Sequence, residues 1–176
     1  MTKYMWKGVK NGMKRIIVIG CPGSGKSTFS RALRDKTGLP LHYLDMLWHK
    51  PDKTNIPTDE FDKRLSEILF TDRWIIDGNY SRTLEMRMKE CDTVFLLDIP
   101  TEECLSGVES RIGTKREEMP WIEEEFDPEF KQYIIDFKTT KLPSVYALLE
   151  KYNDKNIIIF KSRSEIDSYL LSDKFV

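Results

Sequence analysis

The chain has 176 residues and a mass of 20.8 kDa, which predicts one globular domain built around one core. Hydrophobic residues make up 40% and charged residues 32%, and no run approaches the roughly 20 apolar residues that span a bilayer, which argues against a membrane protein. Lys and Arg number 28 against 29 Asp and Glu, so the net charge of −1 gives no sign of a nucleic-acid or anionic-lipid partner. The three scattered cysteines indicate neither a disulfide framework nor a zinc site, and they favour the cytoplasm.

Along the chain, short β-branched runs alternate with longer helical patterns. Residues 1–12 lack the apolar segment of a secretory signal, and we expect a loose extension before a single domain over residues 13–176. Strands are predicted over 16–19, 41–44, 74–76, 94–97 and 157–160, and helices over 26–37, 58–71, 81–91 and 101–111. This alternation predicts an α/β fold with a doubly wound parallel sheet. The polar residues 111–125 predict a lid.

The strongest motif is the glycine-rich segment that follows the first predicted strand. Residues 20–27 read Gly-Cys-Pro-Gly-Ser-Gly-Lys-Ser and satisfy the GxxxxGK[ST] pattern between a strand and a helix. Backbone N–H groups of such a loop wrap a polyphosphate, and the helix N-terminus adds its partial positive charge. We expect Lys26 to reach the β- and γ-phosphates and the Ser27 hydroxyl to join a Mg²⁺ shell. The predicted nucleotide-binding residues here are Gly20, Pro22, Gly23, Ser24, Gly25, Lys26, Ser27 and Thr28.

Four segments together resemble a known group of proteins. They are residues 22–28, 43–48 (Tyr-Leu-Asp-Met-Leu-Trp), 74–82 (Trp-Ile-Ile-Asp-Gly-Asn-Tyr-Ser-Arg) and 94–100. They resemble the nucleoside-monophosphate kinase group of P-loop proteins, which includes adenylate, shikimate and gluconate kinases, and more closely the bacterial topology modulation (FlaR-like) proteins. The resemblance covers residues 14 to about 172. It implies a three-layer α/β/α P-loop NTPase fold with a five-stranded sheet in the order 2-3-1-4-5, and an ATP-dependent phosphotransferase activity.

Two carboxylates at the ends of apolar strands, Asp77 and Asp98, are candidates for the magnesium-linked acid. We choose Asp77, because adenylate-kinase-like proteins carry that acid in the segment Asp-Gly-Phe-Pro-Arg. The arginine of this segment serves the acceptor phosphate, which implies that role for Arg82. Here Asn79 and Tyr80 replace Phe-Pro and one extra residue precedes Arg82, so the target of this arginine stays open. The alternative for either acid is a structural, helix-capping role.

Asp45 follows the second predicted strand, where shikimate-type kinases place the carboxylate that deprotonates an acceptor hydroxyl. If Asp45 instead caps the turn over residues 46–50, that argument disappears. A monophosphate acceptor would need no base at all. Aromatic side chains near the strand ends could line an acceptor pocket or belong to the core. They are Tyr43, Trp48, His49 and Tyr80.

Phosphoryl transfer spreads negative charge over the equatorial oxygens, so a kinase needs cations above the phosphates. Arg111, Lys115 and Arg116 lie where the family places its lid, with solvated surface charges as the alternative. Gly107 stands where adenylate kinases often carry a first lid arginine. Arg163 falls in the region of the family's adenine-contacting loop, with Ser164 as the expected N-cap of a last helix. Residues 123–125, three glutamates, are expected to start a helix.

The leading interpretation is an ATP- and Mg²⁺-dependent kinase of a small molecule, with either a nucleotide or a hydroxyl acceptor. The alternative is a nucleotide-binding regulator of the topology modulation type that contacts DNA or protein with little turnover, and balanced charge counts against DNA. No NKxD segment reads guanine, which favours ATP over GTP. The sequence names neither the acceptor nor the oligomeric state.

Overall fold

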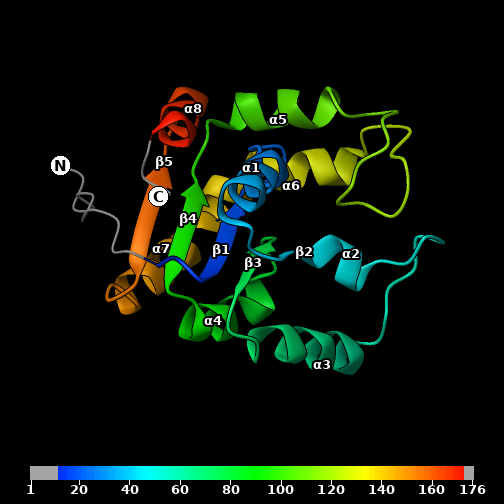
Figure 1. Ribbon diagram of the computed structural model, residues 1–176. Coiled ribbons are helices and arrows are strands. Elements are labelled where there is room, and N and C mark those ends of the chain that lie inside the picture. Colours follow the sequence, from blue (N-terminus) through cyan, green and yellow to red (C-terminus); the bar gives the residue numbers. More distant parts are fainter. Residues whose placement is uncertain (1–11, 173–176) are drawn as a thin grey trace.

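The computed structural model describes residues 12–172 and contains one five-stranded parallel sheet (Figure 1). The central strand β1 (Arg15–Gly20) lies between β3 (Trp74–Asp77) and β4 (Thr93–Leu97), and the edges are β2 (Leu41–Tyr43) and β5 (Asn156–Phe160). The order β2-β3-β1-β4-β5 confirms the predicted topology. All strands run parallel, so their carboxyl ends share one edge of the sheet.

Eight helices are described. They are α1 (Lys26–Thr37), α2 (Leu44–Trp48), α3 (Thr58–Leu69), α4 (Ser81–Glu90), α5 (Thr101–Glu109), α6 (Pro128–Thr140), α7 (Leu142–Lys151) and α8 (Arg163–Leu171). In Figure 1, α1 crosses in front of the sheet and α6 and α7 lie behind it, which gives the expected three layers. No helix among residues 12–172 is long and apolar enough to cross a bilayer.

The core forms because the inner strands are covered on both faces. Ile16, Ile17, Val18 and Ile19 of β1 are completely buried. On the α1 side, Phe29 makes edge-to-face contacts with Phe95 of β4 and Phe160 of β5, at centroid distances of 4.9 and 5.5 Å. This aromatic cluster fixes α1, and with it the loop that precedes α1, against the middle of the sheet.

Some predicted boundaries are wrong. Leu44 does not end β2, because it begins the short helix α2, in which the His49 N–H donates to the Asp45 carbonyl at 2.9 Å. Residues 123–125 do not start a helix: α6 begins at Pro128, and Asp127 caps it by accepting a hydrogen bond from the Phe130 N–H. Ser162, not Ser164, caps α8 through the Glu165 N–H. The expected extension over residues 1–12 lies outside the described residues except for Gly12.

Candidate active site

The glycine-rich loop joins the carboxyl end of β1 to the N-terminus of α1, as a phosphate-binding loop requires. Lys26 and Ser27 occupy the first turn of α1, and the Lys26 ammonium donates to the Cys21 carbonyl at 2.9 Å. Gly20 and Ser24, which belong to this loop and were both predicted to bind nucleotide, are buried. The Cys21 thiol is also buried, and its pKa is raised by contact with the Cys104 thiol and by burial, so Cys21 is a packing residue rather than a nucleophile.

Helix α5 rests directly on this loop. A Cβ at Gly107 would collide with the Gly23 carbonyl oxygen, and a Cβ at Gly23 would collide with the Cys104 carbonyl oxygen. The Arg163 guanidinium lies at the same junction, where it donates to the carbonyl oxygens of Gly23 and Glu103, both at 3.1 Å. Gly107 therefore allows the close approach of α5 to the loop, because it has no side chain.

Asp77 ends β3 next to Ser27, and the Ser27 hydroxyl donates to Asp77 Oδ2 at 2.6 Å. Only 4% of Asp77 is exposed, and its Oδ1 atom is buried without a hydrogen-bond partner. Burial raises the pKa of Asp77 to about 6, although the Lys26 charge and the Ser27 hydrogen bond act in the opposite direction. The Asp77 carboxylate, with its unpaired Oδ1 atom, and the Ser27 hydroxyl are ligands that suit Mg²⁺. Mg²⁺ takes the rest of its coordination shell from water and phosphate oxygens.

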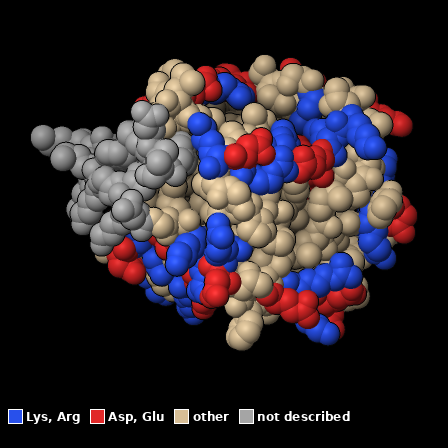
Figure 2. Space-filling model, viewed as in Figure 1, with Lys and Arg blue, Asp and Glu red and all other residues tan. Residues whose placement is uncertain are grey.

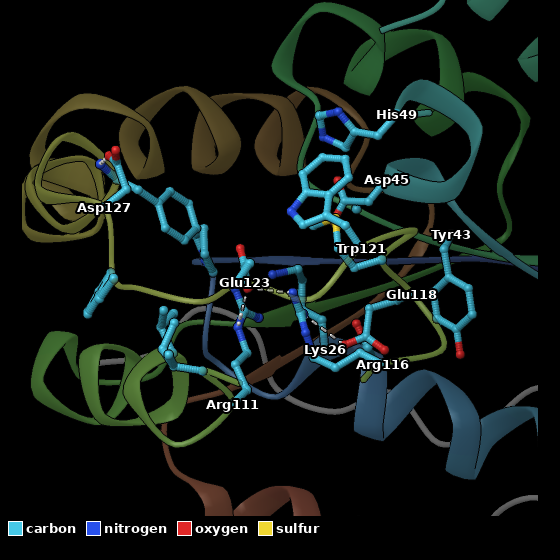
Figure 3. A pocket seen from close by; sticks show the side chains of 18 of the residues that line it. Lys26, Tyr43, Asp45, His49, Arg111, Arg116, Glu118, Trp121, Glu123 and Asp127 are labelled. Atoms are coloured by element: carbon cyan, nitrogen blue, oxygen red, sulfur yellow. Dashed lines mark hydrogen bonds and ion pairs between the residues drawn. The ribbon is translucent and has the colours of Figure 1, made fainter. Parts of the chain in front are cut away.

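Two cavities open on either side of Lys26. The larger has a volume of about 910 Å³ and lies between α2, the segment after β3, the loop 110–127 and α6 (Figure 3). The smaller, of about 870 Å³, lies between the glycine-rich loop, α5 and Arg163. Both cavities share a set of lining residues at their junction: Lys26, Ser27, Arg111, Arg116 and Glu118. A group transferred between the two cavities would pass this cationic junction.

Asp45 lies in the first turn of α2 and lines the larger cavity. It accepts a hydrogen bond at 2.7 Å from the Tyr80 hydroxyl, whose pKa is raised by burial and by the Asp45 charge. Tyr43 and His49 line the same cavity, and the His49 ring meets Trp121 edge-to-face at 5.0 Å. Trp48 instead packs against Phe61 in the core.

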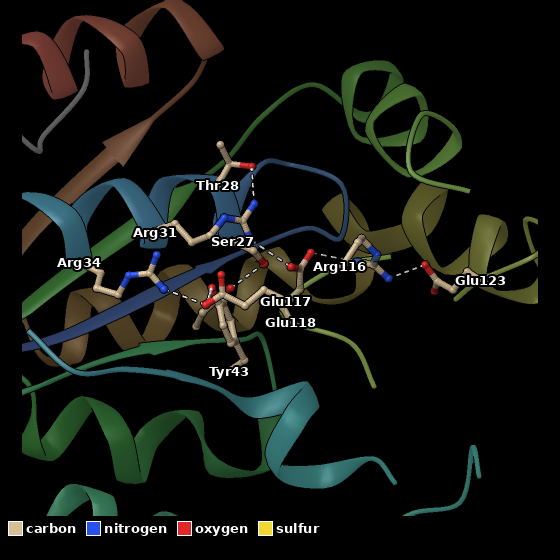
Figure 4. A network of polar contacts seen from close by, with 10 residues as sticks. Ser27, Thr28, Arg31, Arg34, Tyr43, Arg116, Glu117, Glu118 and Glu123 are labelled. Carbon is tan, nitrogen blue, oxygen red and sulfur yellow. Dashed lines mark hydrogen bonds and ion pairs between the residues drawn. The ribbon is translucent and has the colours of Figure 1, made fainter. Parts of the chain in front are cut away.

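The lid predicted near residues 111–125 contains no helix or strand and lies against α1 (Figure 4). Arg116 is nearly buried and bridges Glu118 and Glu123, at 3.1 and 2.6 Å. Arg111 lies 3.6 Å from Glu123, and its pKa is lowered by burial and by Arg116. The structure thus brings both predicted lid arginines to the junction of the cavities. Lys115 lines the smaller cavity.

Acidic lid residues hold this segment to α1. Glu118 pairs with Arg31 at 3.0 Å, and Glu117 pairs with Arg34 at 2.7 Å and accepts a hydrogen bond from the Tyr43 hydroxyl. Arg31 also donates to the Thr28 hydroxyl at 3.3 Å. These contacts connect the lid, the helix behind the glycine-rich loop and the edge strand β2 into one polar network.

Two predicted residues lie elsewhere. Arg82 points to α3, where it forms a two-pronged ion pair with Asp62 at 2.5 and 2.9 Å, and it lines neither cavity. Asp98 accepts hydrogen bonds from Lys161 and from the Tyr146 hydroxyl, next to β5. Asp98 therefore has a structural role, but it pairs with β5-side residues and does not cap α5, whose N-cap is Pro100 without a side-chain hydrogen bond.

Sequence reasoning missed several lining residues of the larger cavity. Phe130 and Tyr133 were missed because α6 was not predicted. The others lie in the loop before α6, where only the charged residues were considered: Glu118, Met119, Trp121 and Phe126. The signal was present: Pro128 follows Asp127 as at many helix starts, and Phe130, Ile134 and Phe137 repeat at helical spacing.

Sequence reasoning also missed Arg87, which is completely buried in α4. Its guanidinium donates to the carbonyl oxygens of Gly78 and Tyr80 at 2.9 and 2.8 Å, and burial lowers its pKa to about 10. Arg87 therefore holds the backbone between Asp77 and Tyr80 in place.

Lys and Arg alternate with Asp and Glu on the face seen in Figure 2, so that face carries no continuous basic surface among the described residues. Non-specific binding to DNA depends on such a surface. The structure gives no support to the DNA-binding alternative on this face.

Comparisons with known proteins agree with this architecture. No family model matches the chain. The adenylate kinase of Thermotoga neapolitana is 29% identical over 89 residues, which cover 49% of this chain and 39% of that enzyme. The chain thus spans well under half the length of the curated relatives it matches.

Solved structures match over more of the chain. A shikimate kinase from Acinetobacter baumannii in complex with shikimate has a TM-score of 0.57 at 18% identity, covering 90% of this chain and 91% of its own. A sugar kinase from a Janibacter species has a TM-score of 0.53 at 16% identity, covering 90% and 93%. The chain has the fold of the P-loop kinases. The finer resemblance to topology modulation proteins stays a prediction.

Proposed function

We propose that this protein is an ATP- and Mg²⁺-dependent phosphotransferase that phosphorylates a hydroxyl group of a small molecule in the cytoplasm. The observation that carries the proposal is the meeting of two cavities at Lys26, Arg111 and Arg116, with Asp45 lining only the larger one. A binding regulator needs one nucleotide cavity, whereas a transferase needs two that meet. The matches to kinases support the same class of reaction.

In this proposal ATP occupies the smaller cavity, with its polyphosphate on the N–H groups of the glycine-rich loop and its base near Arg163. Ser27 and Asp77 would hold Mg²⁺, which supplies charge neutralisation to the phosphates. Lys26, Arg111 and Arg116 stabilise the charge that develops on the equatorial oxygens. For the two arginines this means exchanging Glu118 and Glu123 for phosphate oxygens.

The acceptor occupies the larger cavity with its hydroxyl against Asp45. The acceptor oxygen forms a bond to the γ-phosphorus while the bond to the β,γ-bridging oxygen breaks, ADP leaves, and the acceptor proton passes to the Asp45 carboxylate. Tyr80 orients that carboxylate through its 2.7 Å hydrogen bond. Arg82 of α4 is paired with Asp62 of α3 and lines neither cavity, which favours a hydroxyl over a monophosphate acceptor.

The test is incubation of the full chain with ATP and Mg²⁺ against nucleoside monophosphates, nucleosides, sugars, sugar acids and amino alcohols, with product detected by mass. Lys26→Ala should reduce transfer by several orders of magnitude because it removes the cation nearest the transferring group. Lys63→Ala on the exposed face of α3 is the matched control and should transfer at the wild-type rate. Unchanged turnover in Lys26→Ala would refute the proposal.

A further inference from the structure

This inference rests on the proposed function and concerns the charge of the acceptor. Among the described residues, the larger cavity is lined by four cationic side chains: Lys26, Lys53, Arg111 and Arg116. Four of its carboxylates are Asp45 on α2 and, near Lys26 and the lid arginines, Asp77, Glu118 and Glu123. Three more, Glu124, Glu125 and Asp127, line the side toward α6. The lining therefore carries a formal excess of three negative charges.

Most of these cationic side chains already pair with carboxylates or are needed for the proposed reaction. Arg111 and Arg116 pair with Glu123, and Arg116 also pairs with Glu118. Lys26, Arg111 and Arg116 line the ATP side as well, where the proposed reaction needs them. Lys53 remains, on an exposed turn. A carboxylate or phosphate on the acceptor would thus meet net repulsion in this cavity.

The α6 side of the cavity has the chemistry that binds ammonium groups. The Phe126 and Phe130 rings lie edge-to-face at 6.2 Å, and the Phe130 and Tyr133 rings stack at 6.4 Å, which forms an aromatic wall. Glu124 and Glu125 line this side and make no ion pair with other described residues. A cation is attracted both by ring faces and by carboxylates. Two of these rings already attract cations, since the Lys131 ammonium lies 5.6 Å from the Phe126 ring centroid and the Lys141 ammonium 5.9 Å from that of Tyr133. Figure 3 shows Asp127 on this side, well separated from Asp45.

The interior of the cavity also has polar groups that lack partners. Asn79 lines the cavity beside Tyr133, and neither polar atom of its amide makes a well-formed hydrogen bond. Buried polar atoms without partners are uncommon in native proteins and are costly. The Asn79 amide is therefore available to a polar group of the acceptor.

We propose that the acceptor is a hydroxylated amine, bound with its hydroxyl against Asp45 and its protonated amino group between the aromatic wall and the carboxylates of Glu124 and Glu125. The hydroxyl oxygen takes the γ-phosphoryl group from ATP, ADP leaves, and the hydroxyl proton passes to Asp45. The amino group keeps its proton throughout and serves only for recognition.

The first experiment compares probes that differ in charge. The full chain is incubated with ATP, Mg²⁺ and one probe at a time: ethanolamine, D-glucosamine and kanamycin as cations, D-glucose and cytidine as neutral compounds, and D-gluconate, shikimate and AMP as anions. Binding is measured by calorimetry and transfer by product mass. We expect the best kcat/KM to belong to a cationic probe, at least about tenfold above every neutral and anionic one.

A best kcat/KM for a neutral or anionic probe would overturn this inference and leave the proposed kinase activity standing. Failure to bind or phosphorylate any of the three cations would also overturn it. Failure to bind ATP at all would instead refute the proposed function, since ATP binding depends on the smaller cavity and not on the α6 side.

The second experiment removes the unpaired carboxylates. The double variant Glu124→Gln/Glu125→Gln should raise KM for the best cationic probe about 5- to 20-fold, because each exposed charge contributes modestly. The double variant Glu67→Gln/Asp167→Asn changes the net charge by the same amount at exposed sites outside both cavities. It should leave that KM within about twofold. An equal rise in both double variants would show a general charge effect and contradict the proposed subsite.

Discussion

The contact between α5 and the glycine-rich loop can be tested by adding a single methyl group at Gly107. At a solvent-exposed position inside a helix, replacing glycine by alanine stabilises a protein by about 1 kcal/mol. Here the new Cβ would collide with the Gly23 carbonyl oxygen, a backbone atom that cannot rotate away. Overpacking of this kind costs about 1–3 kcal/mol. Gly107→Ala should therefore leave the free energy of unfolding between unchanged and about 2 kcal/mol lower, rather than raise it.

The same variant should weaken ATP binding, because the strain is relieved by displacing the loop that holds the phosphates. Urea denaturation gives the free energy of unfolding, and calorimetry gives the affinity for ATP. Ser106→Ala is the control for stability, since Ser106 is the exposed preceding residue of α5 and its truncation should change the free energy of unfolding by less than about 0.5 kcal/mol. Ser106 lines the smaller cavity, so Lys63→Ala on α3 is the control for ATP affinity. A Gly107→Ala variant that is about 1 kcal/mol more stable and binds ATP as the wild type does would refute the close contact.

Three further outcomes are expected. Burial raises the pKa of Asp77 from 3.8 to about 6, so the ionised carboxylate lowers the free energy of unfolding by about 3 kcal/mol. Asp77→Asn should therefore raise the free energy of unfolding above pH 6, and this gain should disappear below about pH 4 in urea denaturation. The same variant should lose Mg²⁺-dependent transfer. Asp45→Asn should lower kcat about 10²–10⁴-fold with ATP affinity retained, whereas Arg82→Ala should have little effect on either; the reverse pattern in steady-state kinetics would point to a monophosphate acceptor. Titration with duplex DNA at physiological ionic strength should show no tight, salt-sensitive binding, and nanomolar sequence-selective affinity would favour the regulator.

Local patterns in the sequence were sufficient for the sheet and the phosphate-binding loop. The runs around Ile16, Ile75 and Val94 are continuous and apolar because both faces of those strands are covered, and this burial leaves a readable trace in the sequence. The glycine-rich loop is recognisable for a similar reason, because the backbone geometry around Gly23 tolerates no side chain. The strand order followed from the resemblance rather than from the patterns.

Tertiary structure decided which charged and aromatic residues meet. Arg82 pairs with Asp62, 20 residues away, and so lies outside both cavities, while Glu118 reaches Arg31 from the lid, 87 residues away. Such partners are chosen by the packing of distant elements, and a long charged side chain carries no local signal of its partner. The α6 side of the larger cavity exists only because α6 packs against α5 and α7 and places Phe130 and Tyr133 in the same cavity as the residues after β3. The sequence by itself determined the position of the glycine-rich loop where we propose that phosphates bind, because its glycines are required by local backbone geometry. The tertiary structure decided the shape and charge of the cavities beside that loop, because packing brings together residues that are distant in the chain.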